Sequence, residues 1–472
     1  MKIRPASQIA DMAGGRLIGE DVEVGPDVVL DSRQDTPGAL FIAIDGERVD
    51  GHDYAGVAAE RGAVAALVSR PVDAPLAQIL VDDVPAALSR YARRIADQAL
   101  ASGLVSVALT GSSGKTSTKD MLAQILEPVG PTVAPRGSFN SKLGLPVTVT
   151  AVDETTRFLV AEMGASKIGH IAWLCTIAQP TVAAVLNVGH AHLGEFGSRA
   201  NIAQAKGEIV EALPADGWAV LNADDPLVAT MAPRTSAQLA WFSASGRPPS
   251  DAQCWVGASH VATDELDRAS FRLVGCTPRG SFDEPVAMRT LGLHQVANAC
   301  AAAALAICAG ATPQQAADGL NQAVARSAWR MEPRLLGDGS LLLNDAYNAN
   351  PDSVAAAISS LERLAQARPG TRSVAVLGDM LELGDAAAEA HQTIGRQAAQ
   401  TGAVVVGVGD YASQIVAGAR LAGGEGHALS QANVADWLGS ESFGVLLVKG
   451  SRGVGLESIV NQLVAARGEE TL

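Results

Sequence analysis

The sequence predicts an α/β protein with three domains, and two observations support this fold class. Apolar strand-like segments alternate with helical segments along most of the chain, which is typical of doubly wound parallel sheets. The 472 residues also exceed the size at which a single core stops growing, about 250–300 residues. We therefore expect a small N-terminal α/β domain at 1–102, a central doubly wound parallel sheet built on a phosphate-binding P-loop at 103–330, and a C-terminal Rossmann-like domain at 331–472.

The first of these domains should contain short strands and one long helix. Apolar residues at 88, 91, 95 and 100 recur at helical spacing, which predicts a helix over 84–100 with one buried face. Ala101-Ser-Gly103 interrupts that pattern, so the first boundary is expected near residue 102. The strands are expected at 40–44, 63–68 and 78–81.

In the central segment a polar, turn-rich stretch at about 243–290 is typical of an antiparallel extension, and the alanine-rich 296–309 predicts a buried helix. The expected strands are 104–109, 158–161, 181–186 and 218–221, and the expected helices are 120–126, 171–177 and 202–213.

The alternation restarts after Trp329-Arg330. No G-x-G-x-x-G follows the first strand of this last segment, so we do not expect it to bind NAD. The expected strands are 341–344, 373–377, 404–406 and 445–448, and the expected helices are 353–367 and 386–400.

A glycine-rich segment between the strand 104–109 and the following helix is typical of a phosphate cradle. Its backbone N–H groups can surround phosphates, Lys115 can reach the terminal phosphates, and the Thr116 hydroxyl suits Mg²⁺. Leu109 stands where the full pattern has a glycine, so an ordinary polar turn is the alternative. We expect ATP at this loop, on Thr110, Gly111, Ser112, Ser113, Gly114, Lys115, Thr116 and Ser117.

Composition excludes several classes of protein. A net charge of −15 argues against nucleic-acid binding, which needs a concentrated basic face. The N-terminus has no apolar leader and no run reaches the roughly 18 apolar residues of a membrane span, so we expect a cytoplasmic protein. Five cysteines without C-x-x-C spacing suggest neither disulfides nor zinc. Only seven of the 35 basic residues are lysines, which makes each lysine a candidate for chemistry that arginine cannot perform.

Polar residues follow two strands of the central segment, at the edge where doubly wound sheets bind ligands. Glu162 comes directly after the strand 158–161 and is expected to bind Mg²⁺, with a surface carboxylate as the alternative. His190 and His192 follow the next strand and either bind metal or form structural hydrogen bonds. Lys206, on the following helix, reads by spacing alone as a solvated charge.

The C-terminal segment shows the same pattern twice. Asp345, Asn348 and Asn350 follow a strand and could hold a ribose or a peptide, although a turn and helix N-cap explain them equally well. Lys449 and Arg452 follow the strand 445–448 and suit a carboxylate or a phosphate.

Taken together, these motifs resemble the Mur ligase family of ATP-dependent enzymes that form peptide bonds. The family-wide resemblance is carried, in order, by Thr110-Gly-Ser-Ser-Gly-Lys-Thr116, Ala161-Glu-Met-Gly164, His190-Ala-His-Leu193, Ala205-Lys206, Asn222-Ala-Asp-Asp-Pro226 and Trp329-Arg-Met-Glu332. A resemblance to the members that add D-alanyl-D-alanine is carried by Asp345-Ala-Tyr-Asn-Ala-Asn-Pro351, Leu377-Gly-Asp-Met-Leu-Glu-Leu-Gly384 and Val448-Lys-Gly-Ser-Arg452.

The resemblance implies an ATP and Mg²⁺ site. Lys206 matches the family lysine that CO₂ converts to a carbamate, a reaction open to an amine but not to a guanidinium. His294 is a less secure match to an ATP-contacting position. The implied metal ligands are Thr116, Glu162, His192 and Lys206, the implied catalytic residues are Lys115, Lys206, His192 and Arg330, and the further ATP contacts are Asn298, Arg330 and Asp345.

The resemblance also implies two further substrates, UDP-N-acetylmuramoyl-tripeptide, whose third residue is lysine or diaminopimelate, and D-alanyl-D-alanine. The N-terminal domain would bind the UDP end, and the C-terminal domain would bind ATP and the incoming dipeptide. The enzyme would form an acyl phosphate from ATP and act as a monomer. The implied substrate contacts are Ser32, Arg33, Asn140, Asn348, Asn350, Lys449 and Arg452.

Two alternatives remain open. One is another amide ligase of the superfamily, either the diamino-acid-adding muramoyl ligase, whose Asp-Asn-Pro-Arg signature is absent from this chain, or folylpolyglutamate synthase. The other is a P-loop switch that hydrolyses nucleotide only to change shape, although the sequence holds no Asn-Lys-x-Asp guanine-reading motif.

Overall fold

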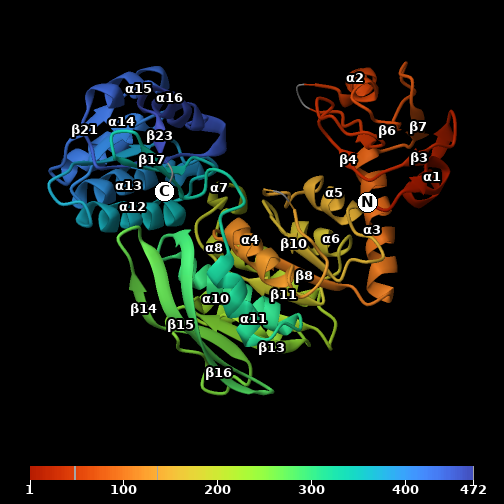
Figure 1. The fold of residues 1–472 in the computed structure, drawn as a ribbon, viewed down its shortest axis with the longest axis horizontal. Helices are drawn as coiled ribbons and strands as arrows, with labels where there is room; N and C mark the ends of the chain where they lie inside the picture. Colours follow the sequence, from red (N-terminus) through yellow and green to blue (C-terminus); the bar gives the residue numbers. More distant parts are fainter. Residues whose placement is uncertain (47–48, 136, 471–472) are drawn as a thin grey trace.

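The computed structural model describes residues 1–46, 49–135 and 137–470. Two α/β domains flank a larger central one, with the N-terminal domain in red and orange and the C-terminal domain in blue (Figure 1). The expected fold class, α/β with three domains, is confirmed. The boundaries at 102 and 330 stay predictions. In the described residues no helix is both long and apolar enough to cross a membrane.

The N-terminal domain is built on a five-stranded sheet of order β2-β7-β6-β5-β4, in which only the β2–β7 pair is antiparallel. Helix α3 (Val84–Ala101) begins where the Asp83 side chain accepts a hydrogen bond from Ala86 N–H, and it buries Leu88, Tyr91 and Ile95 as expected. The other elements are α1 (Ala6–Ala13), α2 (Ala55–Glu60), β1 (Arg4–Pro5), β2 (Arg16–Ile18), β3 (Glu23–Val24), β4 (Val28–Val29), β5 (Leu40–Ile42), β6 (Ala65–Val68) and β7 (Ala77–Leu80).

The central domain contains a nine-stranded sheet of order β16-β15-β14-β13-β12-β11-β8-β10-β9. The strands from β9 to β14 are parallel, and the pairs β14–β15 and β15–β16 are antiparallel, so the expected antiparallel extension continues the same sheet. The strands are β8 (Val105–Thr110), β9 (Thr132–Val133), β10 (Phe158–Glu162), β11 (Val182–Val185), β12 (Trp218–Asn222), β13 (Gln238–Ser243), β14 (Trp255–Thr263), β15 (Arg268–Thr277) and β16 (Gly280–Leu291).

Helices cover both faces of this sheet because its strands carry apolar side chains on both faces. In β8, Val107 and Leu109 pack toward α4, α10 and α11, whereas Ala108 faces the core that α5, α6 and α8 share. Helix α4 begins at Lys115, earlier than expected, because Gly114 caps it in a left-handed conformation. The helices are α4 (Lys115–Leu126), α5 (Gly144–Thr150), α6 (His170–Cys175), α7 (Leu193–Phe196), α8 (Arg199–Glu211), α9 (Pro226–Ala229), α10 (Gln295–Cys308) and α11 (Pro313–Gln322).

The C-terminal domain is a seven-stranded sheet of order β21-β20-β19-β22-β18-β17-β23, parallel from β21 to β18. Helices α12, α13 and α14 cover one face, and α15 and α16 cover the other. The elements are β17 (Glu332–Leu336), β18 (Leu341–Asp345), α12 (Pro351–Gln366), β19 (Ser373–Leu377), α13 (Ala387–Gln400), β20 (Val404–Gly407), α14 (Ala412–Leu421), β21 (Gly426–Ala428), α15 (Gln431–Ser440), β22 (Val445–Lys449), α16 (Glu457–Arg467) and β23 (Glu469–Glu470).

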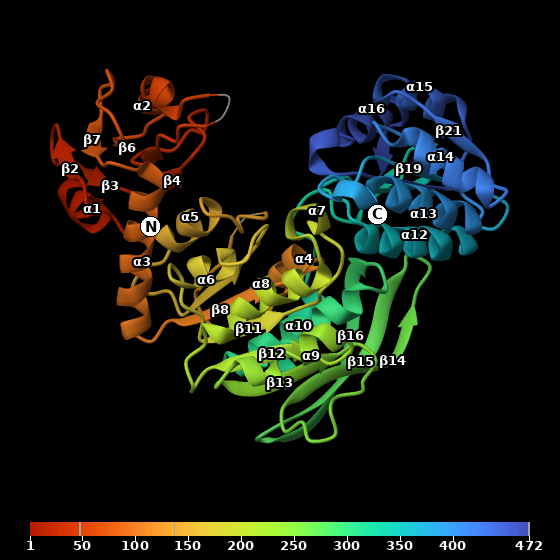
Figure 2. The ribbon, with the colours of Figure 1, turned by 180° about the vertical axis from the view of Figure 1, so that it is seen from behind.

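The C-terminal domain rests on the antiparallel extension of the central domain. The ends of β14 to β16 meet α12, as Figures 1 and 2 both show. At this contact the Arg363 guanidinium donates two hydrogen bonds, of 2.5 and 3.0 Å, to the Asp267 carboxylate, which is fully buried. Leu266 and Leu291 pack against the core of the C-terminal domain beside this pair. The ligand-binding edges of the two sheets are thereby held near each other.

Candidate active site

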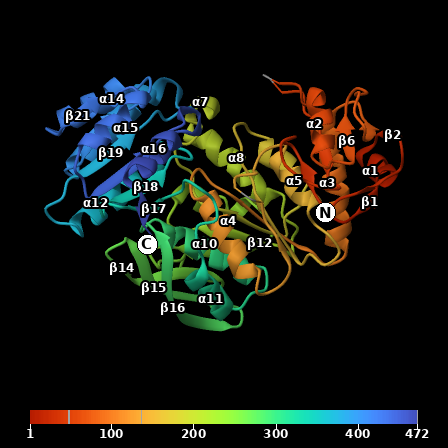
Figure 3. The same ribbon diagram turned by 45° about the horizontal axis from the view of Figure 1, so that its top comes forward.

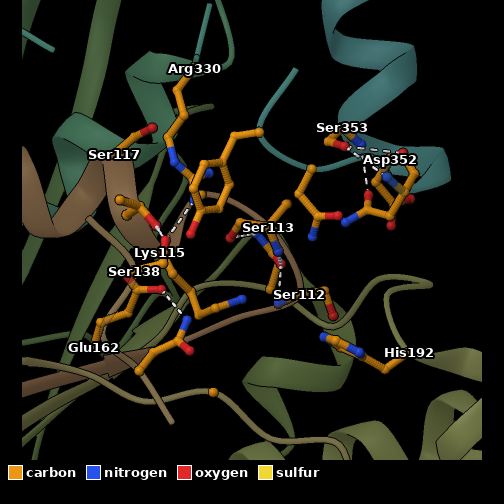
Figure 4. A pocket seen from close by; sticks show the side chains of 18 of the residues that line it. Ser112, Ser113, Lys115, Ser117, Ser138, Glu162, His192, Arg330, Asp352 and Ser353 are labelled. Atoms are coloured by element: carbon orange, nitrogen blue, oxygen red, sulfur yellow. Dashed lines mark hydrogen bonds between the residues drawn. The ribbon is translucent and has the colours of Figure 1, made fainter. Parts of the chain in front are cut away.

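A cavity of about 870 Å³ lies where the P-loop meets the C-terminal domain (Figure 4). Its central wall comes from the carboxyl ends of β8, β10 and β11, and its C-terminal wall comes from the ends of β18 and β22. The predicted site residues that line it are Ser112, Ser113, Gly114, Lys115, Thr116, Ser117, Asn140, Glu162, His192, Lys206, His294, Asn298, Arg330, Asp345, Asn348, Asn350 and Lys449.

The P-loop is held by Asn187 and lies against Asn298, both from other segments. Ser112 N–H and Ser113 N–H donate to Asn187 Oδ1 at 2.9 and 3.0 Å. Gly114 has a φ of +79°, and a Cβ there would lie 2.3 Å from Asn298 Oδ1, so both the backbone angle and the close approach favour glycine. Asn187 therefore fixes the first half of the loop, and the close approach at Gly114 sets the start of α4 at the cavity.

Lys115 folds back over the P-loop. Its Nζ donates to Gly111 O at 2.7 Å. Burial lowers the pKa of Lys115, with the Arg330 charge acting in the same direction and the Glu162 carboxylate opposing both. An anion in the cavity would offset the cost of burying the charged ammonium, as expected of a lysine that binds phosphate.

A chain of polar contacts joins Thr116 to Arg330. Thr116 Oγ1 and Ser138 Oγ are 2.8 Å apart, and Arg330 Nη2 donates to Ser138 Oγ at 2.8 Å. The Arg330 guanidinium also stacks 4.1 Å above the Tyr347 ring. These contacts therefore place the Arg330 guanidinium, which lies between the two domains, beside the Thr116 hydroxyl at the start of α4.

Glu162 is buried at the end of β10 and half of its carboxylate is free. Asn140 Nδ2 donates to Oε1 at 2.6 Å, whereas Oε2 has no hydrogen-bond partner among the described residues. The free Oε2 and the Thr116 hydroxyl are the hard oxygen donors that Mg²⁺ prefers. Across the described ranges no three His, Cys, Asp or Glu side chains gather at metal-binding spacing. A cation here would thus need further oxygens from nucleotide, water or a modified side chain.

Lys206 is buried on α8 and lines the cavity. In residues 1–46, 49–135 and 137–470 no hydrogen bond or ion pair reaches its amine. Burial lowers the pKa of Lys206 well below its ordinary value, and the charge of Lys115 adds to this effect. The structure thus holds a buried amine at the cavity whose charged form is disfavoured.

Both loop histidines contact carboxylates of the C-terminal domain. His192 Nδ1 lies 2.5 Å from Glu382 Oε2, and this contact with His192 lowers the pKa of Glu382, although burial opposes that shift. His190 Nδ1 lies 3.1 Å from Asp352 Oδ1. His294, just before α10, is half-buried, and desolvation lowers its pKa. The two loop histidines therefore connect the central domain to the C-terminal domain at the cavity.

The C-terminal wall is organised by one buried ion pair. Lys449 Nζ donates to Asp345 Oδ2 at 2.5 Å and to Asn348 O at 2.9 Å. The parallel register of β18 and β22 sets Asp345 directly opposite Lys449. Asn350 caps α12, where its side chain accepts from Ser353 N–H at 2.9 Å. Lys449 and Asn350 therefore have structural partners although both line the cavity.

Five predicted site residues lie elsewhere in the part of the chain that the structure describes. Thr110 is fully buried at the end of β8, and Gly111 serves as the acceptor for Lys115. Ser32 and Arg33 belong to the N-terminal domain, where Arg33 donates to Asp31 at 2.9 and 2.7 Å. Arg452 stacks 4.1 Å above the Trp329 ring and pairs with Glu457.

Several lining residues were missed by the sequence analysis. Ser138 lies two residues before the predicted Asn140, and Asn187 lies two residues after the end of β11, so their positions could have indicated them. Tyr347 lies inside a motif whose asparagines were chosen instead. The missed residues are Ser138, Ser141, Lys142, Leu143, Gly164, Ala165, Ser166, His170, Leu174, Asn187, Gln295, Ala297, Met331, Tyr347, Asp352, Ser353 and Ala356.

Three family models match successive parts of the chain. Residues 27–96 match "Mur ligase family, catalytic domain", residues 109–306 match "Mur ligase middle domain", and residues 329–452 match "Mur ligase, glutamate ligase domain".

Individual relatives match over nearly the whole length. The UDP-N-acetylmuramoyl-tripeptide–D-alanyl-D-alanine ligase of Mycobacterium tuberculosis is 41% identical, and that of Escherichia coli is 36% identical, each over 97% of both chains. MurF from Acinetobacter baumannii superposes with a TM-score of 0.83, at 32% identity over 98% of this chain and all of that one. MurF ligase from Thermotoga maritima, solved in complex with ADP, gives a TM-score of 0.74, at 28% identity over 93% of this chain and 96% of that one. The chain belongs to the Mur ligase family.

Proposed function

We propose that this chain joins D-alanyl-D-alanine to UDP-N-acetylmuramoyl-tripeptide, using ATP and forming ADP and phosphate. The observation that carries the proposal is the single cavity that the P-loop shares with the carboxyl edge of the C-terminal sheet. An enzyme that only hydrolysed nucleotide would need the first wall, whereas a ligase must also hold an acceptor against it. The relatives that match the whole chain carry the name of this activity.

The nucleotide would lie along the central wall. Gly114, Lys115 and Thr116 would hold the phosphates, with Arg330 above them and Asn298 beside the loop. Asp345 would accept a ribose hydroxyl with Oδ1, which also accepts from Met331 N–H, while Oδ2 stays with Lys449. The remaining loop residues Thr110, Gly111, Ser112, Ser113 and Ser117 would shape or line this phosphate site.

Magnesium fits the oxygen donors of this site. Thr116 Oγ1 and Glu162 Oε2 would hold it, His192 would add a ring nitrogen, and the bound ion would neutralise charge on the transferring phosphate. Lys206 would contribute as a carbamate, formed when its neutral amine attacks CO₂ and releases a proton. The new carboxylate would attract the Lys115 ammonium and supply two oxygens.

The reaction would proceed in two steps inside the cavity. An oxygen of the tripeptide's terminal carboxylate attacks the γ-phosphorus, and the bond from that phosphorus to ADP breaks, which yields an acyl phosphate. The dipeptide amine then attacks the acyl carbon, loses a proton, and the carbon–oxygen bond to phosphate breaks. Lys115 and Arg330 are placed to balance negative charge in the first step, and exclusion of water protects the acyl phosphate from hydrolysis.

Substrate ends would be held on all three domains. Ser32 and Arg33 would contact the UDP end, and Asn140 would contact the peptide beside Glu162. Asn348, Asn350, Lys449 and Arg452 would border the dipeptide, with Lys449 acting through Asp345. We place the reaction in the cytoplasm, where ATP is available, with the chain acting as a monomer that size-exclusion chromatography with light scattering would verify.

The experiment that tests this function measures phosphate release from ATP and Mg²⁺ with UDP-N-acetylmuramoyl-tripeptide, in the presence and absence of D-alanyl-D-alanine. We expect one phosphate to be released per pentapeptide formed, and only when both the tripeptide substrate and D-alanyl-D-alanine are present. Phosphate release that ignores the dipeptide and yields no mass gain would overturn the ligase assignment in favour of a nucleotide switch. Glycyl-glycine in place of the dipeptide serves as the acceptor control.

A further inference from the structure

The loop that carries His192 touches a second loop, 382–384, of the C-terminal domain. His192 Nδ1 lies 2.5 Å from Glu382 Oε2, and Gly194 N–H donates to Glu382 O at 3.0 Å. Of the residues that the structure describes, those lining the cavity include His192 but not Glu382. Figure 3 shows α7, which starts at Leu193, beside the blue C-terminal domain. Glu382 therefore reaches the cavity only through the imidazole.

The backbone on both sides of this contact is constrained. His192 has a φ of +59° and Glu382 a φ of +68°, a left-handed conformation that non-glycine residues adopt rarely and mainly where their surroundings hold it. A Cβ on Gly194 would lie 2.7 Å from Gly384 N and 2.9 Å from Glu382 O, so the loops meet backbone to backbone. Both loops are thus shaped for this one contact.

The short distance indicates which ring nitrogen carries the proton. His192 Nδ1 and Glu382 Oε2 lie 2.5 Å apart, although the contact lacks the alignment of a hydrogen bond, and two acceptors repel each other at this distance. The contact therefore favours the tautomer with its proton on Nδ1, on the side of Glu382. Nε2 is then the nitrogen left for the cavity, into which the His192 side chain points in Figure 4. A carboxylate on one ring nitrogen is the usual partner of a histidine whose other nitrogen binds a metal.

We propose that Glu382 is a positioning residue that sets the tautomer and orientation of His192, so that Nε2 faces the cation site only when the C-terminal domain is docked. The inference rests on the proposed function, because His192 is there assigned to Mg²⁺. It assigns a role to the 377–384 motif, which the proposed function leaves without one. It also makes the metal site a sensor of domain docking.

A simpler role, in which the pair only holds the domains together, leads to different expectations. The contacts of Asp352 with His190 and of Arg363 with Asp267 already join the same two domains. If Glu382 served only adhesion, its loss would change docking but not the state of one imidazole. The ring nitrogens of His192 therefore provide the discriminating measurement.

The test uses the full chain with ADP and compares Glu382→Ala, Glu382→Gln and Gly194→Ala. Mn²⁺ affinity is measured by electron paramagnetic resonance, and the ring ¹⁵N shifts of His192 are measured on protein labelled at histidine. Glu425→Ala is the matched control, because Glu425 pairs with His427 at 2.9 Å away from the cavity lining among the described residues. Near-ultraviolet circular dichroism establishes that each variant is folded.

We expect Glu382→Ala to weaken Mn²⁺ binding about 10- to 100-fold and to shift His192 from a single Nδ1–H tautomer to a mixture. Glu382→Gln keeps an acceptor and should stay within about threefold of wild type. Gly194→Ala forces the loops apart and should match Glu382→Ala, and combining the two should add little. The Glu425→Ala variant should behave as wild type.

Unchanged ¹⁵N shifts and unchanged Mn²⁺ affinity in Glu382→Ala would overturn the inference, as would a Glu382→Gln variant as defective as the alanine. These outcomes are separable from failure of the proposed function. A chain that forms pentapeptide but whose His192 ignores Glu382 loses only the positioning role. A chain without ligase activity whose His192 tautomer follows Glu382 loses only the reaction.

Discussion

Replacing Lys449 by methionine should destabilise the C-terminal domain strongly. The Lys449 side chain is 2% exposed and that of Asp345 is 12% exposed, so the substitution leaves a nearly buried carboxylate whose remaining protein donor is Met331 N–H at 3.1 Å. Removing one partner of a buried ion pair costs about 3–5 kcal/mol. For a domain of about 150 residues that loss lowers the melting temperature by on the order of 10 °C.

The assay is thermal unfolding of the Lys449→Met variant, with Lys2→Met as control because Lys2 forms only an exposed pair with Glu154. Adding Asp345→Asn removes the stranded charge and should restore most of the lost stability, which gives a double-mutant cycle. A Lys449→Met protein with wild-type stability and only a raised KM for D-alanyl-D-alanine would refute the reasoning. Lys449 would then be a ligand of the dipeptide carboxylate, not an internal counterion.

Three further outcomes are expected. His391 is buried and accepts from Met380 N–H, and burial lowers its pKa below the value in the unfolded chain. Its contribution to stability is therefore present above about pH 6.5 and is lost as the pH falls, by up to about 1.4 kcal/mol per pH unit. In urea unfolding, the His391→Asn variant should lose less stability than wild type between pH 6.5 and 5, and an equal loss in both proteins would contradict this. Lys206→Met should lower kcat on the order of 100-fold, and ¹³C-bicarbonate should give a carbamate signal in the wild-type protein alone; a signal in both proteins would place the carbamate elsewhere. Arg363→Ala strands the buried Asp267 carboxylate and should cost about 3 kcal/mol in urea unfolding, whereas a loss below about 0.5 kcal/mol would show that water reaches the pair.

Much of the fold could be predicted because its signals are local. The strands at β8, β10 and β11 are apolar runs that end in polar residues, and their carboxyl ends meet at one edge in any parallel sheet. Glu162 and the P-loop were therefore placed without knowledge of the tertiary structure. Strand β17 was missed because Glu, Pro and Arg interrupt its apolar pattern, and β23 was missed because it spans only two residues. Both lie at the edge of the sheet beside β18.

The missed parts of the site depend on contacts between distant segments. Arg330 meets Ser138, which lies 192 residues earlier, and no periodicity in the sequence indicates that meeting. The filter that treated each lysine as a chemical candidate was also too generous. Lys119 is buried in an ion pair with Asp120 and donates to Pro135 O at 2.9 Å, which is a structural role. The sequence can single out a lysine as a candidate for chemistry, but only the tertiary structure shows whether that lysine already has an ion-pair partner.

The turn-like alternative for 345–351 also proved partly right. Asn350 caps α12 in a reciprocal capping box with Ser353, which is ordinary helix-start chemistry. Asp345 differs, because one of its oxygens faces Lys449 and the other accepts Met331 N–H. A sequence pattern cannot separate these cases, since both use a polar residue after a strand.

The central claim, that ATP activates a carboxylate for attack by an amine, is tested most directly by isotope transfer. UDP-N-acetylmuramoyl-tripeptide carrying ¹⁸O in its terminal carboxylate is converted with ATP and D-alanyl-D-alanine, and the inorganic phosphate is analysed by mass spectrometry. One ¹⁸O atom per phosphate is the result this account expects, because the carboxylate oxygen that attacks the γ-phosphorus leaves with it. Unlabelled phosphate, with the departing carboxylate ¹⁸O recovered in water instead, would contradict the acyl-phosphate route.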